Sequence, residues 1–101
     1  MSETSINTND LEVAHNEALR RFEIRIEGHE PAVLTYARTG STLNLMHAGT
    51  PRELEGRGIA AKITKHALEY AREHDLRVVP SCPFVASYIK RHPEYADLVK
   101  L

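Results

Sequence analysis

One change of hydrophobic period limits what this chain can fold into. Over residues 42–47, Leu43 and Leu45 alternate with polar side chains, which is the period of a half-buried β-strand. The next apolar residues recur at the 3.6-residue spacing of a helix, at Ile59, Ile63, Ala67 and Tyr70. A short apolar strand follows at residues 77–80. If both strands share a sheet, the helix between them makes them parallel.

The residues before this unit predict further strands. In residues 22–26, apolar and charged side chains alternate, and residues 32–38 are mostly apolar. The turn after the first segment contains Gly28, and the turn after the second contains Gly40. Together with residues 42–47 they predict an antiparallel meander, and residues 48–51 are expected to break its last strand. The expected fold class is therefore α+β, or α/β in the sense of one mixed sheet with helices. It combines an antiparallel meander with a strand-loop-helix-strand crossover.

The remaining segments complete a single predicted domain over residues 11–101. The polar residues 1–10 predict a disordered tail, because they have little to bury. Residues 11–19 predict a helical turn or a lead-in to the first strand. Further helices are expected at residues 84–90, after Pro83, and at 93–99. The predicted solvent-exposed surface of the long helix contains Lys62, Lys65 and Arg72.

The charge of the chain excludes several classes of partner. There are 13 Lys+Arg and 14 Asp+Glu, which leaves no basic excess for a nucleic-acid or membrane-surface binder. No apolar run approaches the roughly 18 residues of a membrane span. The N-terminus has no apolar export segment, and the single cysteine, Cys82, has no disulfide partner, so we expect a cytoplasmic location. The expected oligomeric state is a monomer. The histidines share no ligand spacing, and we predict no metal.

The loop before the long helix has features of an anion site. Gly56 and Gly58 flank Arg57, and the first backbone N–H groups of a helix are unpaired and carry its positive dipole. The alternative is a flexible turn that caps the helix, because short glycine motifs are common. A Walker loop and a dinucleotide fingerprint are excluded, since the required lysine or third glycine is missing.

Two motifs resemble a known family. Residues 56–60, Gly-Arg-Gly-Ile-Ala, resemble the acyl-CoA pyrophosphate loop of GNAT-type N-acetyltransferases. Residues 80–95 are similar to the compact subgroup of that superfamily, in which a proline-small-cysteine turn leads into a helix ending near Arg-His-Pro. The similarity covers roughly residues 20–100. The chain departs from the subgroup at Ala48 and Thr50, where His-Thr-x-Val-Pro is expected, so residue 48 has no hydroxyl to position a substrate.

The resemblance implies transfer of an acetyl group from acetyl-CoA to an amine, either a small molecule or a protein lysine. Coenzyme A would be the co-substrate, with its pantetheine arm beside residues 45–47 and its pyrophosphate on residues 55–60. Lys90 and Arg91 would reach the nucleotide phosphates. The cofactor-binding residues implied in this way are Met46, Glu55, Gly56, Arg57, Gly58, Ile59, Ala60, Lys90 and Arg91.

Three residues are candidates for catalysis. Cys82 would accept the acetyl group or interact with the departing thiol, unless it is a buried and inert cysteine. His47 would act as the base, and Tyr88 would protonate the thiolate. The alternatives are a structural hydrogen bond for His47 and a core position for Tyr88. At the level of function, the alternatives are a non-catalytic acyl-CoA binding or sensing module, and an interaction domain without a coenzyme A site.

Overall fold

The computed structural model describes residues 7–100, which form one mixed five-stranded sheet with helices. The strand order is β1-β2-β3-β4-β5, in which the first four strands are antiparallel and β5 is parallel to β4. This arrangement confirms the predicted fold class. The elements are η1 (Thr8–Asp10), β1 (Ala14–Asn16), β2 (Arg21–Ile24), β3 (Ala32–Thr39), β4 (Thr42–Gly49), η2 (Arg52–Leu54), α1 (Ile59–Glu73), β5 (Arg77–Pro80), α2 (Pro83–Arg91) and η3 (Pro93–Leu98), where η denotes a 3-10 helix.

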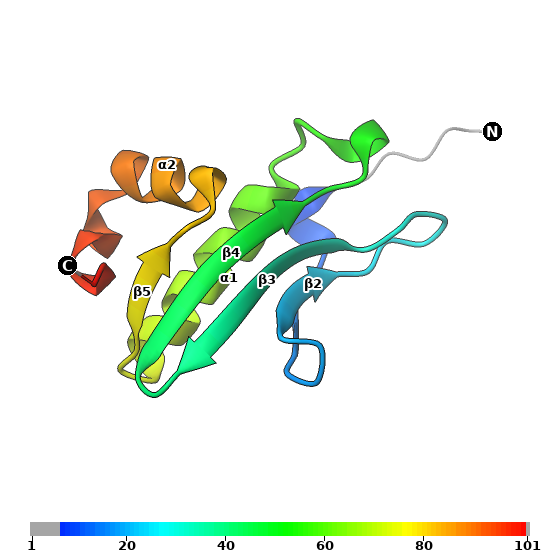
Figure 1. Ribbon diagram of the computed structural model, residues 1–101. Coiled ribbons are helices and arrows are strands. Elements are labelled where there is room, and N and C mark those ends of the chain that lie inside the picture. The colour runs from blue at the N-terminus through cyan, green and yellow to red at the C-terminus, as the bar shows by residue number, and fades with distance from the viewer. Residues whose placement is uncertain (1–6, 101) are drawn as a thin grey trace.

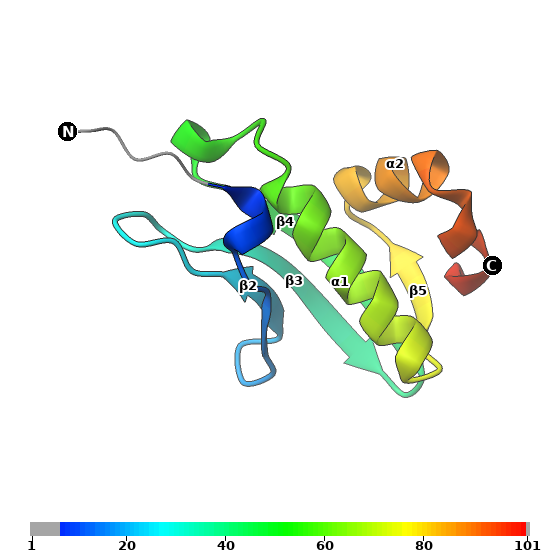
Figure 2. The ribbon, with the colours of Figure 1, turned by 180° about the vertical axis from the view of Figure 1, so that it is seen from behind.

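Helix α1 packs across one face of the sheet, as Figures 1 and 2 show from opposite sides. Residues three and four apart share a face of a helix, and this face of α1 buries Ile59, Ile63, Ala67, Leu68 and Ala71. From β3, every second residue is buried against it, namely Ala32, Leu34 and Tyr36. No helix of the described residues lies over β2 and β3 on the other face (Figure 1). The sheet therefore has one covered and one open face in this region.

The N-terminal region differs from its prediction. Residues 14–16 form β1, which pairs with β2 in the register Ala14↔Glu23 and replaces the predicted helical turn or lead-in. His15 holds this short strand in place, because its ring stacks on Phe22 and its Nε2 lies 2.6 Å from the hydroxyl of Tyr36. The pairing shows that long-range contacts, rather than local pattern, define β1.

The predicted tail, residues 1–10, is ordered in the part that the structure describes. Residues 1–6 lie outside the described residues. The Thr8 hydroxyl donates to the carbonyl of Arg57 at 2.7 Å, and the Lys62 ammonium donates to the carbonyl of Thr8 at 2.8 Å. The prediction of Lys62 as a merely solvated side chain is therefore wrong. These bonds attach η1 to the loop and first turns of α1.

Two strand ends also differ from prediction. β4 continues through Gly49 instead of ending at residue 47, because Ala48 and Gly49 pair with Leu34 and Val33 of β3. Conversely, β2 ends at Ile24, two residues before the predicted end. Alternation of apolar residues does not reveal where a neighbouring strand stops offering hydrogen bonds.

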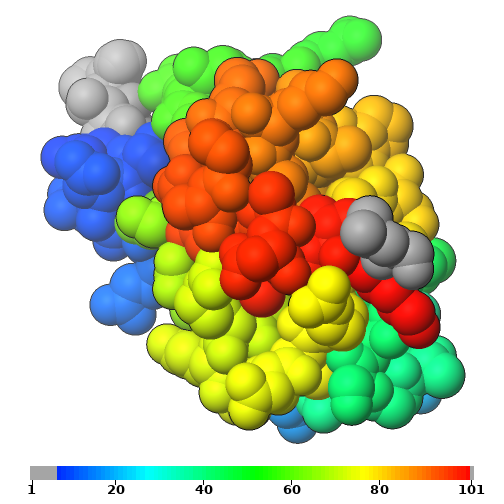
Figure 3. All heavy atoms as spheres, turned by 90° about the vertical axis from the view of Figure 1, so that its left-hand side faces the viewer, coloured from blue at the N-terminus to red at the C-terminus, as the bar shows by residue number. Residues whose placement is uncertain are grey.

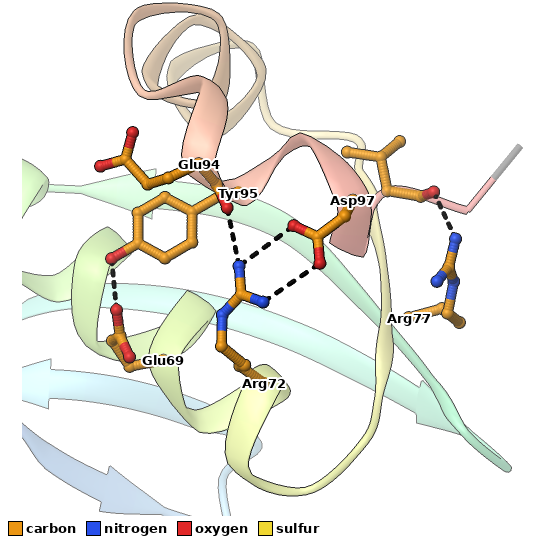
Figure 4. Close-up of polar contacts among 7 residues, drawn as sticks. Glu69, Arg72, Arg77, Glu94, Tyr95 and Asp97 are labelled. Carbon is orange, nitrogen blue, oxygen red and sulfur yellow. Dashed lines mark hydrogen bonds and ion pairs between the residues drawn. The ribbon is translucent and has the colours of Figure 1, made fainter.

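The C-terminal segment is attached to α1 by polar contacts (Figure 4). Arg72 is exposed, as predicted, and it also forms a bidentate ion pair with Asp97 at 3.1 Å and donates to the carbonyl of Glu94. The Tyr95 hydroxyl donates to Glu69 at 2.5 Å. The helix predicted at residues 93–99 is the 3-10 helix η3, which lies at the surface on the side of the molecule that Figure 3 shows.

We predict that Tyr95→Phe lowers the free energy of unfolding by about 1–2 kcal/mol, because a buried phenol loses a hydrogen bond to a carboxylate. Chemical denaturation in urea, followed by circular dichroism, measures the change. Tyr70→Phe is the matched control, since the Tyr70 hydroxyl has no hydrogen-bond partner among residues 7–100. Equal losses in both variants would contradict the proposed contribution of this bond.

The same contact predicts a dependence on alkaline pH. Burial, followed by the hydrogen bond and charge of Glu69, raises the pKa of Tyr95 above its ordinary value of 10.0. A group with a raised pKa in the folded state contributes stability that is complete below its unfolded pKa and is lost as the pH rises above it. Stability should therefore fall above about pH 10, and this loss should be smaller in Tyr95→Phe.

Candidate functional site

Strand β4 and the edge strand β5 part at one point, and the candidate site forms there. Parallel pairing between β4 and β5 ends at Leu45↔Pro80, whereas β4 continues to Gly49. On the other side, the β3 partner changes from Leu45↔Tyr36 to His47↔Thr35, so Met46 is the extra residue of a β-bulge. A bulge bends its strand and increases the local twist. Among the described residues, the segment after Leu45 has a strand partner only in β3.

A pocket of about 250 Å³ lies beside this opening. It is bounded by the end of β4, the loop that follows, the N-terminus of α1 and the first turn of α2. Its lining residues are Ala48, Thr50, Leu54, Glu55, Gly56, Ile59, Ala60 and Phe84. The pocket is thus built from segments that the sequence separates by more than thirty residues.

The N-terminus of α1 presents unpaired amides at this pocket. Gly58 is the N-cap in the left-handed conformation with φ +81°, and no side chain within residues 7–100 caps the helix. The first turn of α1 carries no acidic residue that would offset the positive end of the helix dipole, although the acidic residue Glu55 lines the same pocket. Gly56 is also left-handed, with φ +84°. The backbone conformation at these two positions favours glycine, and an added Cβ at either would meet no atom within 4 Å.

The predicted cofactor residues fall into two groups. Glu55, Gly56, Ile59 and Ala60 line the pocket, while Arg57 and Gly58 belong to the same loop and Met46 is exposed at the bulge. Lys90 and Arg91 lie in the last turn of α2, roughly 10 Å along the helix from the pocket residue Phe84. The structure therefore brings the loop residues together and leaves the two α2 cations apart from them.

Cys82 lies at the point where the strands part. It is the N-cap residue of α2, and its backbone N–H donates to the carbonyl of Leu45 at 2.9 Å. Its side chain belongs to the core and the residue is only 4% exposed. The position next to the opening agrees with the catalytic hypothesis, whereas the burial agrees with the packing alternative.

His47 and Tyr88 face other surroundings. Paired residues of neighbouring strands share a face, and His47 pairs with Thr35, which alternates with the buried Leu34 and Tyr36. His47 is therefore exposed on the sheet face opposite α1. Tyr88 is 5% exposed and its ring stacks on His92, with centroids 4.0 Å apart. Burial, reinforced by the charge of Glu94, raises the pKa of Tyr88.

Sequence reasoning missed some of the residues at this site. Leu54 and Phe84 line the pocket, and the only hint in the sequence is an apolar side chain inside an otherwise polar loop at Leu54. Ser81 donates to the side-chain oxygen of Asn44 at 2.6 Å, which joins β4 to the end of β5 just before the strands part. No spacing in the sequence predicts this contact.

The described residues contain neither a metal-binding cluster nor a membrane-spanning helix. Within residues 7–100, no group of three or more His, Cys, Asp or Glu side chains is arranged to hold a metal ion. No helix in that part of the chain combines the length and the apolar character needed to cross a bilayer.

Comparison with known proteins relates this geometry to a family. The sequence model of the GCN5-related N-acetyl-transferase family matches residues 21–98. Protein NATD1 from Xenopus tropicalis is 34% identical over 88 residues, covering 85% of this chain and 81% of that protein. Protein NATD1 from Homo sapiens is 35% identical over 85 residues, covering 82% of this chain and 75% of that protein.

A solved structure has the same fold. The solution NMR structure of a GCN5-like protein from Staphylococcus aureus superimposes with a TM-score of 0.70 and 30% sequence identity, covering 90% of this chain and 89% of that one. The family match spans the whole unit from β2 to η3, including the opening between β4 and β5. The chain therefore belongs to the GCN5-related N-acetyltransferase family.

Proposed function

We propose that this protein transfers an acetyl group from acetyl-CoA to an amine. The observation that carries the proposal is the opening beyond Leu45, where an unpaired strand edge lies beside a pocket at the uncapped N-terminus of α1. Such an arrangement suits an extended donor that ends in a diphosphate. Family membership supports the same reaction class.

The donor would bind along two surfaces. Its pyrophosphate would accept hydrogen bonds from the free amides at the start of α1, near Gly58 and Ile59, where the helix dipole favours a negative charge. Arg57 is exposed in the same loop and adds a positive charge. The amide groups of the pantetheine arm would pair with the free edge of β4 beyond Met46, as an added strand does. The thioester would then lie near Cys82.

The chemistry requires one bond exchange and the net transfer of one proton, directly or through a base. The amine nitrogen attacks the thioester carbonyl, the carbon–sulfur bond breaks, and the proton lost by the amine goes to the coenzyme A thiolate. Backbone N–H groups near the bulge would stabilise the negative charge on the carbonyl oxygen. His47, which is exposed on the sheet face opposite α1, is the candidate for receiving the amine proton. The packing of Tyr88 favours its structural alternative over proton donation.

Cys82 allows a two-step form of this reaction. Its thiolate would attack the acetyl carbonyl and release coenzyme A, and the amine would then attack the acetyl-cysteine thioester. The location of Cys82 next to the opening beyond Leu45 supports this role. Its burial requires that the bound donor, rather than bulk water, contacts the sulfur.

A second candidate function is an acyl-CoA binding module without turnover. The nearly complete burial of Cys82 is compatible with it, since a thiol used only for packing would remove the two-step route and leave only direct attack by an amine. Release of free coenzyme A in the presence of an amine panel separates the two functions, because both bind the donor but only the enzyme consumes it. For the enzyme, a protein lysine in the cytoplasm remains one candidate acceptor.

We predict that Gly58→Glu binds coenzyme A at least about tenfold more weakly than Gly58→Gln. Both side chains strain the left-handed backbone at residue 58 equally, and only glutamate places a negative charge beside the pyrophosphate. Two like charges near a protein surface repel by about 4 kcal/mol at 4 Å before salt screening. Isothermal titration calorimetry at low salt measures both dissociation constants. Equal constants would exclude the N-terminus of α1 as the pyrophosphate site.

We also predict that Cys82→Ala lowers turnover at least about 100-fold if the thiol is the nucleophile. Intact-mass spectrometry after acetyl-CoA treatment should show one acetyl group on the wild type and none on the variant. Cys82→Ser keeps the packing and removes most of the nucleophilicity, and should be similarly slow. Near-normal turnover in both variants, with reduced urea stability in Cys82→Ala, would assign Cys82 to packing.

A further inference from the structure

The acceptor must reach the thioester from a side that the donor leaves free. The pocket beside Gly56 and Ile59 is formed by the N-terminus of α1, on the covered side of the sheet. A donor in this pocket would block that approach to Met46. The opposite face has no helix over β2 and β3 among the described residues (Figure 1), and His47 is exposed there. This face, which we call the open face, is where acceptor-binding groups are expected.

The open face carries one organised charge cluster, formed by Arg21, Glu23 and Arg25 of β2 and the residue after it. Phe22 and Ile24 point to the core, so these three alternate residues point the other way. Glu23 is 3% exposed and accepts from Nε of Arg21 at 2.7 Å and from Nε of Arg25 at 3.2 Å. Each carboxylate oxygen thus holds one guanidinium group.

This cluster leaves hydrogen-bond donors unused. Within residues 7–100, no group accepts a hydrogen bond from the terminal nitrogens of Arg21 or Arg25. The Arg25 side chain is 72% exposed and that of Arg21 is 25% exposed. Two cations against one carboxylate leave a local charge of plus one. Burial by itself raises the pKa of Glu23, but the two arginines outweigh it and lower that pKa, so Glu23 stays ionised at neutral pH.

The strand register relates this cluster to the reaction centre. Arg21 pairs with Thr35, and Thr35 pairs with His47, so the three residues form one row across β2, β3 and β4 on the open face. Neighbouring strands lie about 4.8 Å apart, which places Arg21 roughly 10 Å from His47 along the row. An arginine side chain spans more than half of that distance. A short molecule can therefore contact the guanidinium groups and His47 together.

We propose that the acceptor is a small amine that also carries a carboxylate, and that Arg21 and Arg25 bind this carboxylate on the open face. Guanidinium groups match a carboxylate with paired N–H donors, and Glu23 fixes both of them before the acceptor arrives. The amine end then lies toward His47 and Met46. This inference rests on the proposed acetyl transfer and adds to it a substrate class.

The test compares matched acceptors in a coenzyme A release assay. Glycine, β-alanine and γ-aminobutyrate are paired with methylamine, ethylamine and propylamine, which lack only the carboxylate. The wild type should show kcat/KM at least about tenfold higher for the best aminocarboxylate than for its partner. Arg21→Gln and Arg25→Gln should abolish this preference, mainly through KM. Arg25→Gln is the safer variant for folding, because its side chain is largely exposed.

Arg38→Gln is the matched control, since Arg38 is an exposed arginine of β3 that donates to the carbonyl of Gly40 rather than to the cluster. It should keep the wild-type preference. Equal kcat/KM for both members of every pair, or a preference that both cluster variants retain, would overturn the inference. Acetylation of a lysine peptide in preference to every aminocarboxylate would overturn it as well.

A binding experiment separates this inference from the proposed function. In NMR titrations of the coenzyme A complex, aminocarboxylates should shift the amide signals of Thr35, His47 and the residues around Glu23 more than the simple amines do. Such shifts without any release of coenzyme A would contradict acetyl transfer and retain the carboxylate site. Release of coenzyme A with simple amines, without these shifts, would retain acetyl transfer and reject the carboxylate site.

Discussion

The geometry of β4 determines most of what this molecule presents to a ligand. The strand is paired on both sides up to Leu45, and beyond it the bulge at Met46 turns it away from β5 while β3 continues to hold it. The backbone N–H of Cys82 donates to the carbonyl of Leu45, at the end of the ladder that β4 shares with β5. Because β5 ends at Pro80 and the chain turns into α2, β4 has a free edge beyond Leu45, and the bulge bends the strand at the same point.

Several elements that meet around the opening contribute the groups that a ligand would contact. The crossover connection places the N-terminus of α1 at the same end of the sheet as the end of β5, because parallel strands finish on one edge. The helix amides therefore lie beside the free edge of β4, while Phe84 of α2 closes the pocket from the other side. The contacts of Arg72 and Tyr95 attach the C-terminal segment to α1 (Figure 4) and so hold α2 from its far end.

The sequence predicted the parts whose cause is local. The period change between residues 42–47 and α1 identified the crossover, and Gly56 and Gly58 identified the loop, because left-handed backbone favours glycine. It did not predict β1, whose few residues become a strand through the contacts of His15 with Phe22 and Tyr36. For the same reason, the true ends of β2 and β4 could not be read from alternation alone.

What the sequence by itself determined is the order and type of the main elements, the glycine loop and the presence of one thiol, since each follows from residue identity and spacing along the chain. Only the tertiary structure decided that Cys82 is buried, that His47 faces away from α1, and that Arg21 and Arg25 share the carboxylate of Glu23. These outcomes depend on which strands pair and in which register. A single-residue shift of register reverses the face of every side chain, and no local pattern fixes it.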